Sequence, residues 1–294
     1  MSRHDPLLKI GWQAQDFLKE LGIASLPVNP FEIAERLDIS LMAMPSSQGG
    51  PSGMLIHVDG QFGIGYPTQI ESEGFKRFSV AHELGHFRLP GHMDAVLDPS
   101  GKHISQAGFI NQNQYEIEAD HFAASLLMPT NLFSREVEGT DPDFIGIQKL
   151  ADLCVISLEA TAIRFAQCSR NPSAIIRSEK GTIDYCFMSR SLKDFPGIEY
   201  IRRGSALSHD TVTYRFNSHP EKVRHSARES GVSRLQDWFG GQERQRISEE
   251  VVGLGRYGKT LTLLTDIDLP EDDFADEEAE DRELTESWTP RFRR

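Results

Sequence analysis

The ten residues FSVAHELGHF, which run from Phe78 to Phe87, decide the fold of this chain and indicate its chemistry. Residues four apart lie one turn apart on the same face of a helix, so His82 and His86 present two imidazoles side by side. Two imidazoles so placed can bind one zinc ion, each at about 2.0–2.1 Å. Glu83 follows the first histidine, and its carboxylate can reach a metal-bound water without being a ligand itself. The stretch predicts a catalytic metal site on a helix.

The alternative interpretation of this stretch is a helix surface that bears two unrelated histidines. The chain has only ten histidines, so the pattern rarely arises by chance. Apolar residues such as Phe78, Val80 and Leu84 surround the motif, which predicts a partly buried environment for both imidazoles. Gly85 removes a side chain where another backbone or a substrate can approach. These neighbours favour the metal site.

A catalytic zinc site needs a third protein ligand and one open position. The segment YEIEADHFAASLLMP, which begins at Tyr115, predicts a second helix that ends before Pro129. Glu116 and Asp120 lie four apart on it, so one carboxylate can bind metal while the other orients a ligand imidazole. We favour Glu116 as the third ligand.

Two other residues compete with Glu116 as the third ligand. Glu118 points about 200° away from it on the helix, and its alternative interpretation is a solvated charge. His92 lies ten residues after His82, which is the spacing of the third histidine in HExxHxxGxxH metalloproteases. The turn glycine of that pattern would fall at Leu89, so the match is incomplete.

Turn and capping residues divide the rest of the N-terminal half into short elements. Asn29 and Pro30 predict a helix start, because asparagine caps helix N-termini and proline fits the first helical position. Asp59-Gly60 predicts a hairpin turn. Residues 93–113 read as a long loop, a candidate lid. We expect helices at 11–22, 30–38, 75–89 and 113–128, a hairpin at 53–67, and two short helices within 142–168, broken around Val155-Ile156.

The residue composition and the predicted secondary structure change after about residue 170. Segments 174–189, 210–216 and 254–265 favour β-structure and are separated by turns. From Asp266 to Glu286 the chain carries twelve acidic residues and one arginine, which is most of its net charge of −13. Such a composition predicts disorder. We expect domains at 1–171 and 172–265 and an acidic tail at 266–294.

Composition excludes several classes of protein. The near-neutral body is unsuited to general nucleic-acid or membrane-surface binding. Three cysteines without a CxxC pair argue against a disulfide scaffold and favour ordinary apolar packing. No stretch approaches the roughly 18 apolar residues that span a bilayer, and the N-terminus lacks a signal-peptide core. We expect a cytoplasmic protein with no membrane partner.

The two coupled motifs carry a family resemblance. FSVAHELGH, then a loop, then YEIEADHFAASLLMP, resembles the ImmA/IrrE family of zinc metallopeptidases, and PVNPFEIAERLDISL upstream is similar to the family's N-terminal helix. The resemblance covers roughly residues 25–168. It implies an α+β fold: a mostly helical, zincin-like domain with a small sheet, here followed by a smaller β-rich domain. It also implies one Zn²⁺ per chain held by His82, His86 and Glu116, with Glu83 as base.

The resemblance also implies a function. Members of the family are site-specific endopeptidases, and several cleave helix-turn-helix repressors and so derepress stress-response or mobile-element genes. We therefore expect a protein substrate and no direct nucleic-acid binding. Two rival hypotheses are a DNA-binding regulator with a structural zinc site and a toxin–antitoxin-type partner without catalysis. A weak helix-turn-helix pattern at 150–165 has only Arg164 as a basic residue in its second helix, which is poor for phosphate contact.

The mechanism that follows needs a substrate strand and an oxyanion partner. Gly53–His57 or Gln61–Tyr66 would offer an edge on which an extended peptide pairs. Tyr66 and Tyr115 are both candidates for stabilising the oxyanion, and nothing in the sequence selects one. Among the other histidines, His57 and His103 are too isolated to assign a role, and His121 is interpreted as structural.

Overall fold

A computed structural model of the chain describes residues 6–44, 52–68, 72–105, 113–241 and 245–267. These residues form two compact units. The first contains the residues up to Arg135 together with Leu150–Ala160, and the second contains Glu136–Lys149 and the residues from Thr161 on. The domain boundary expected after residue 171 stays a prediction.

The first unit is a mixture of helices and one small sheet, as the sequence predicts. Asn29 caps α2 by accepting a hydrogen bond from the Phe31 backbone N–H, with Pro30 at the first helical position. The elements are α1 (Pro6–Glu20), α2 (Pro30–Arg36), β1 (Ser40–Met44), β2 (Gly53–Val58), β3 (Gln61–Pro67), α3 (Glu73–Arg88), α4 (His92–Val96), β4 (Lys102–Ser105) and α5 (Gln114–Leu127).

The four strands of this unit lie in the order β1-β3-β2-β4. β2 and β3 form the predicted hairpin, and Asp59 and Gly60 at its turn have φ values of 52° and 75°. Positive φ at both central residues is the geometry that matches the twist of a hairpin. One expectation is wrong: neither Gly53–His57 nor Gln61–Tyr66 is an edge, because β1 pairs with β3 and β4 pairs with β2 on the outer sides.

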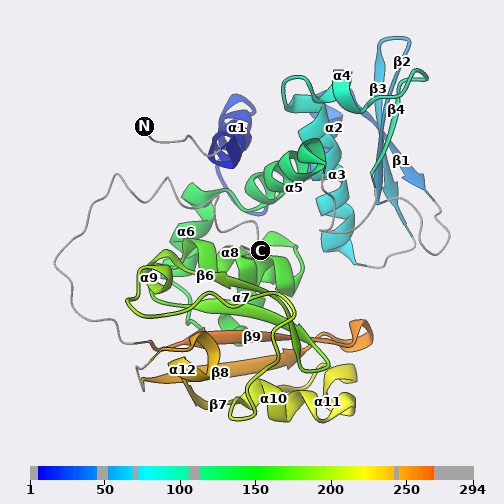
Figure 1. The fold of residues 1–294 in the computed structure, drawn as a ribbon. Coiled ribbons are helices and arrows are strands. Elements are labelled where there is room, and N and C mark those ends of the chain that lie inside the picture. The colour runs from blue at the N-terminus through cyan, green and yellow to red at the C-terminus, as the bar shows by residue number, and fades with distance from the viewer. Residues whose placement is uncertain (1–5, 45–51, 69–71, 106–112, 242–244, 268–294) are drawn as a thin grey trace. The chain divides into compact units, whose positions relative to one another are not determined.

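Helices α3 and α5 pack closely against each other, and Figure 1 shows them side by side. Gly85 of α3 lies at their contact: a Cβ atom there would come within 3.2 Å of Cα of Ala119 on α5. Gly85 thus makes room for another backbone, as its position in the motif predicts. This approach brings the motif-bearing faces of the two helices together.

The segment from 93 to 105 is more regular than expected. Instead of an uninterrupted loop it contains the end of α4 and the four-residue strand β4. Asp98 organises the turn between them, since its carboxylate accepts hydrogen bonds from the backbone N–H groups of Ser100 and Lys102. Pairing with β2, distant in sequence, defines β4 as a strand. Residues 106–112 of the candidate lid lie outside the described residues.

Three helices connect the regular parts of the two units. The break predicted around Val155-Ile156 is present: Val155 adopts a left-handed φ of 56° between two helices. Ser157 then caps the next helix by accepting a hydrogen bond from the Ala160 N–H. The helices are α6 (Thr130–Glu138), α7 (Phe144–Cys154) and α8 (Leu158–Cys168).

The second unit is built on a five-stranded antiparallel sheet of order β6-β5-β9-β8-β7. A core of buried apolar residues, with Trp238 and Phe239 among them, packs on it. The elements are β5 (Ala174–Glu179), β6 (Thr182–Met188), α9 (Arg190–Lys193), α10 (Val212–Asn217), α11 (Pro220–Arg224), β7 (Arg228–Arg234), α12 (Leu235–Phe239), β8 (Arg246–Gly253), a 3₁₀ turn (Gly255–Tyr257) and β9 (Lys259–Thr265). The expected α+β class, with a β-rich second part, is confirmed.

One β-segment expected in this unit is wrong. Residues 210–216 mostly form helix α10, because Thr211 caps it by accepting a hydrogen bond from the Tyr214 N–H. The apolar residues of VTYRF alternate as in a strand. The cap at Thr211 and the packing of this segment on β8 nevertheless stabilise a helix.

Three further expectations concern the acidic tail, the cysteines and membrane-spanning helices. The acidic tail lies almost entirely outside the described residues, which end at Ile267. Cys154, Cys168 and Cys186 are all free thiols. Within the ranges that the structure describes, no helix combines the length and the apolar character needed to cross a membrane.

Candidate metal centre

Three buried side chains from α3 and α5 converge on one point. His82 and His86 stand one turn apart on α3, and their Nε2 atoms are 3.1 Å apart. Glu116, on the first turn of α5, places Oε2 3.3 Å from His82 Nε2 and Oε1 3.4 Å from His86 Nε2. The cap at Asn113 starts α5 just upstream and so sets the position of Glu116.

The spacing and the donor set of this group fit a tetrahedral metal ion. The edge of a tetrahedron with metal–ligand bonds of 2.0–2.1 Å is about 3.3–3.4 Å, close to the separations among the three side chains. Two imidazole nitrogens and a carboxylate oxygen are the ligands of many catalytic zinc sites. The group of His82, His86 and Glu116 can therefore hold a metal ion.

Neighbouring side chains fix the orientation of both imidazoles. His82 Nδ1 lies 2.8 Å from Asp120 Oδ1, so the ring directs Nε2 towards the centre of the site. Burial alone would lower the pKa of His82, but hydrogen bonds to Asp120 and Glu116 outweigh it and raise the pKa to about 10. The acidic surroundings therefore favour a positive charge at this point, which suits a cation.

His92 and Glu118 lie on the side of His86 that faces away from Glu116, and they do not point at the centre of the site. His92 Nδ1 is 3.2 Å from His86 Nδ1, on the side of the ring away from Glu116. The other nitrogen of His92 lies 3.0 Å from Glu118 Oε2. Neither belongs to the three-residue metal group, and the pairing with His92 replaces the solvated charge expected for Glu118.

Glu83 is fully buried between α3 and the sheet. Its Oε1 accepts a 2.7 Å hydrogen bond from the Ser105 hydroxyl, whereas its Oε2 has no hydrogen-bond partner among the described residues. Gly53 of β2 lies directly against it: a Cβ there would be 2.3 Å from Glu83 Oε1. Burial raises the pKa of the Glu83 carboxyl. One oxygen is thus anchored and the other is left for a further partner.

Strand β4 contributes two side chains to the site that the sequence does not single out. His103 Nε2 lies 3.0 Å from Glu116 Oε1, and its ring packs 4.6 Å from that of His86. Ser105, two residues on, contacts both Glu83 and His103. No local pattern marks either residue, because β4 is short and only its pairing with β2 aims both side chains at α3.

The other candidates make different contacts. Tyr66 packs edge-on against Phe31, and Tyr115 packs edge-on against His92. His57 stacks on Phe62 in the hairpin. No described contact joins any of these three candidates to the metal group.

Comparison with known families agrees with this geometry. Residues 34–166 match the IrrE N-terminal-like domain, a metallopeptidase family, and the match contains all three members of the metal group and Glu83. The domain belongs to the ImmA/IrrE family. The resemblance seen in the sequence is thereby confirmed. No curated protein matches the chain.

A solved structure extends the similarity to the second unit. A Mycobacterium tuberculosis transcriptional regulator matches with a TM-score of 0.53 and 16% sequence identity. The match covers 88% of this chain and 76% of that chain. At this identity the similarity concerns the fold alone.

Proposed function

We propose that this chain, which carries an ImmA/IrrE-family domain at residues 34–166, is a zinc-dependent, site-specific endopeptidase that holds its metal through His82, His86 and Glu116. The observation that carries the proposal is the hydrogen bonding of the Glu83 carboxylate beside this group. Ser105 donates a hydrogen bond to one of its oxygens, and the other oxygen has no partner among the described residues. A bound zinc ion would supply Lewis acidity and lower the pKa of water towards about 7.

Glu83 acts as the proton carrier of the reaction. Its free Oε2 accepts the proton of the attacking water and passes it to the leaving amine. Burial raises the pKa of Glu83, which makes the carboxylate a better proton acceptor. The hydrogen bond from Ser105 and the packing on Gly53 keep the carboxylate in one place.

Substrate binds along β4 in this proposal, not along β2 or β3. β4 is an outer strand of the described sheet, so an extended peptide can pair with its open side. The same strand carries His103, which lies within 3.0 Å of Glu116. An imidazole there can donate a hydrogen bond to the oxyanion that develops on the scissile carbonyl, which gives His103 the role considered for Tyr66 or Tyr115.

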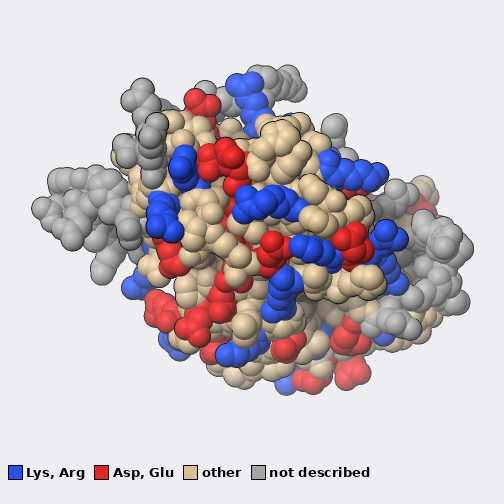
Figure 2. All heavy atoms as spheres, turned by 90° about the horizontal axis from the view of Figure 1, so that it is seen from below, with Lys and Arg blue, Asp and Glu red and all other residues tan. Residues whose placement is uncertain are grey.

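The substrate we propose is a helix-turn-helix repressor in the cytoplasm, cleaved to derepress stress or mobile-element genes. The similar fold of a protein named as a transcriptional regulator is compatible with work in gene regulation. Direct DNA binding is disfavoured by Arg164, the basic residue of the weak helix-turn-helix pattern, which is only 3% exposed. On the face drawn in Figure 2, described Lys and Arg side chains are interspersed with acidic ones.

A substrate trap tests this function. Glu83→Gln is expressed in the native cells beside a matched control, Glu73→Gln, which alters an exposed glutamate on the same helix. Co-purifying proteins are identified by mass spectrometry. We expect Glu83→Gln to retain one metal ion per chain and to enrich a helix-turn-helix protein, which the wild type cleaves in the presence of zinc. Enrichment of the same proteins by both variants, or undiminished cleavage by metal-loaded Glu83→Gln, would contradict the proposal.

A further inference from the structure

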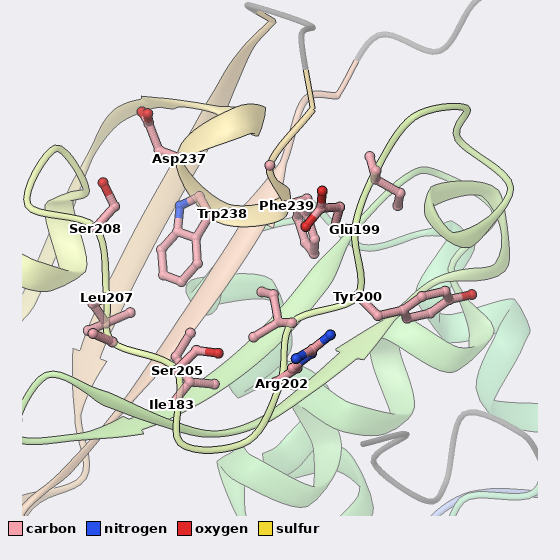
Figure 3. A pocket seen from close by; sticks show the side chains of 14 residues that line it. Ile183, Glu199, Tyr200, Arg202, Ser205, Leu207, Ser208, Asp237, Trp238 and Phe239 are labelled. Atoms are coloured by element: carbon pink, nitrogen blue, oxygen red, sulfur yellow. The ribbon is translucent and has the colours of Figure 1, made fainter. Parts of the chain in front are cut away.

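The second unit contains a cavity of about 680 Å³ that the peptidase chemistry does not use. It lies between the irregular segment 198–208 and helix α12, and Ile183 of β6 also lines it (Figure 3). Cavities of 300–1,000 Å³ with mixed apolar and polar walls are typical small-molecule sites. Every lining residue belongs to the second unit.

Trp238 gives this cavity a rigid apolar wall. Its indole N–H is 3.3 Å from both Ser233 Oγ and Glu249 Oε2, two buried acceptors, so the ring orientation is fixed. The ring therefore offers the cavity an apolar surface and no free N–H. Ile183 and Leu207 extend this surface, and both are at most 4% exposed.

Two oppositely charged side chains line the same cavity, and neither has a partner among the described residues. The side chains of Glu199 and Arg202 make no ion pair or hydrogen bond with a described residue, and they do not pair with each other. Figure 3 shows Glu199 near Phe239 and Arg202 nearer Ser205. The third charged lining residue, Asp237, already accepts a hydrogen bond from the Arg234 N–H. The cavity thus presents one available cation and one available anion.

Three backbone N–H groups between these charges also have no partner among the described residues. Glu199 donates its N–H to the Phe239 carbonyl, but the N–H groups of Tyr200, Ile201 and Arg202 have no described acceptor. Three residues of extended chain span at most about 10–11 Å. A ligand with an ammonium at one end, a carboxylate at the other and a peptide backbone between them can satisfy both charges and this backbone.

We propose that this cavity binds a short peptide of two or three residues with apolar side chains. Its C-terminal carboxylate pairs with Arg202, its N-terminal ammonium pairs with Glu199, and its side chains pack on Trp238. A phosphorylated ligand is excluded by charge, since Glu199 and Asp237 would face it with a single arginine to compensate. The proposal is independent of the metal centre.

Isothermal titration calorimetry on the full-length chain tests the proposal. The probe is the tripeptide leucyl-valyl-phenylalanine, free or with its C-terminus amidated, and the protein carries Glu83→Gln so that cleavage cannot consume it. Arg202→Gln is compared with Arg203→Gln, a neighbouring exposed arginine that does not line the cavity. We expect binding at millimolar concentration or below, and a loss of about tenfold or more on Arg202→Gln or on amidation.

The substitution Arg202→Gln and the amidation of the peptide can also be combined, as in a double-mutant cycle. If the carboxylate meets Arg202, amidation weakens binding to the Arg203→Gln chain but causes little further loss with Arg202→Gln. Equal affinity of the two arginine variants, equal affinity of free and amidated probe, or no heat at millimolar peptide would overturn the proposal. Peptide held at the metal centre would give the first of these results, because Arg202 is not part of that site.

Discussion

Replacement of Gly53 by alanine tests how closely the catalytic carboxylate is held. The new Cβ would lie 2.3 Å from Glu83 Oε1 and 3.1 Å from its Cδ, whereas ordinary contact begins at 3.4 Å. Gly53 is backbone in a paired strand, so the carboxylate must retreat, by about 1 Å. A displacement of 1 Å at a reacting group can cost about 100-fold in rate, and we expect that loss in kcat/KM.

The assay for Gly53→Ala separates position from metal binding. Cleavage is followed on a peptide selected from a proteome-derived library, and metal content is measured by mass spectrometry. Gly63→Ala is the control, since its Cβ would meet Met42 Cε at a tolerable 3.5 Å in the same sheet. We expect one metal ion per chain in both variants. Wild-type kcat/KM in Gly53→Ala, or an equal loss in Gly63→Ala, would refute the reasoning.

Three further variants probe separate contacts. Asp120→Asn should weaken metal affinity by about 10- to 100-fold in chelator competition, because the charge that orients His82 is lost. Ser105→Ala should lower kcat/KM by about tenfold at unchanged metal content, because the hydrogen bond to Glu83 is lost. Glu249→Ala should lower the free energy of unfolding in urea by about 2–4 kcal/mol, because it leaves buried donors unpaired.

Two of these variants, Asp120→Asn and Glu249→Ala, have a control that removes a similar group elsewhere. Glu118→Gln should affect metal affinity less than Asp120→Asn, since Glu118 contacts His92 and not a metal ligand. Glu229→Ala, which removes a half-exposed ion pair with Lys222, should change stability by about 1 kcal/mol at most. Equal effects of variant and control in either comparison would show that the contact is not the cause.

The parts of the site that lie within one helix could be predicted from the sequence. His82 and His86 share a face because they are four apart, and the same spacing relates Glu116 to Asp120. The hairpin turn at Asp59-Gly60 is likewise a local property, since φ is positive at both residues. Local rules of this kind need no knowledge of the tertiary structure.

The parts that depend on pairing of distant segments could not be predicted. β4 has only four residues, and its register with β2 aims His103 and Ser105 at α3. In the second unit the sequence does not predict β7 and β8, because β7 is a largely exposed strand with few apolar residues and β8 buries a charged residue, Glu249. That charge is tolerated only because Thr213 and Trp238 donate to it from other elements.

The most direct measurement of the central claim is cleavage of a proteome-derived peptide library by wild type and Glu83→Gln, each with its metal content determined. We predict one metal ion per chain in both, cleavage at a restricted set of sites by the wild type, and a loss of about 100- to 10,000-fold in Glu83→Gln. A chelator should abolish cleavage and zinc should restore it. Equal cleavage by both chains, or none by the metal-loaded wild type on any peptide, would contradict the assignment of Glu83 as the base of a metallopeptidase.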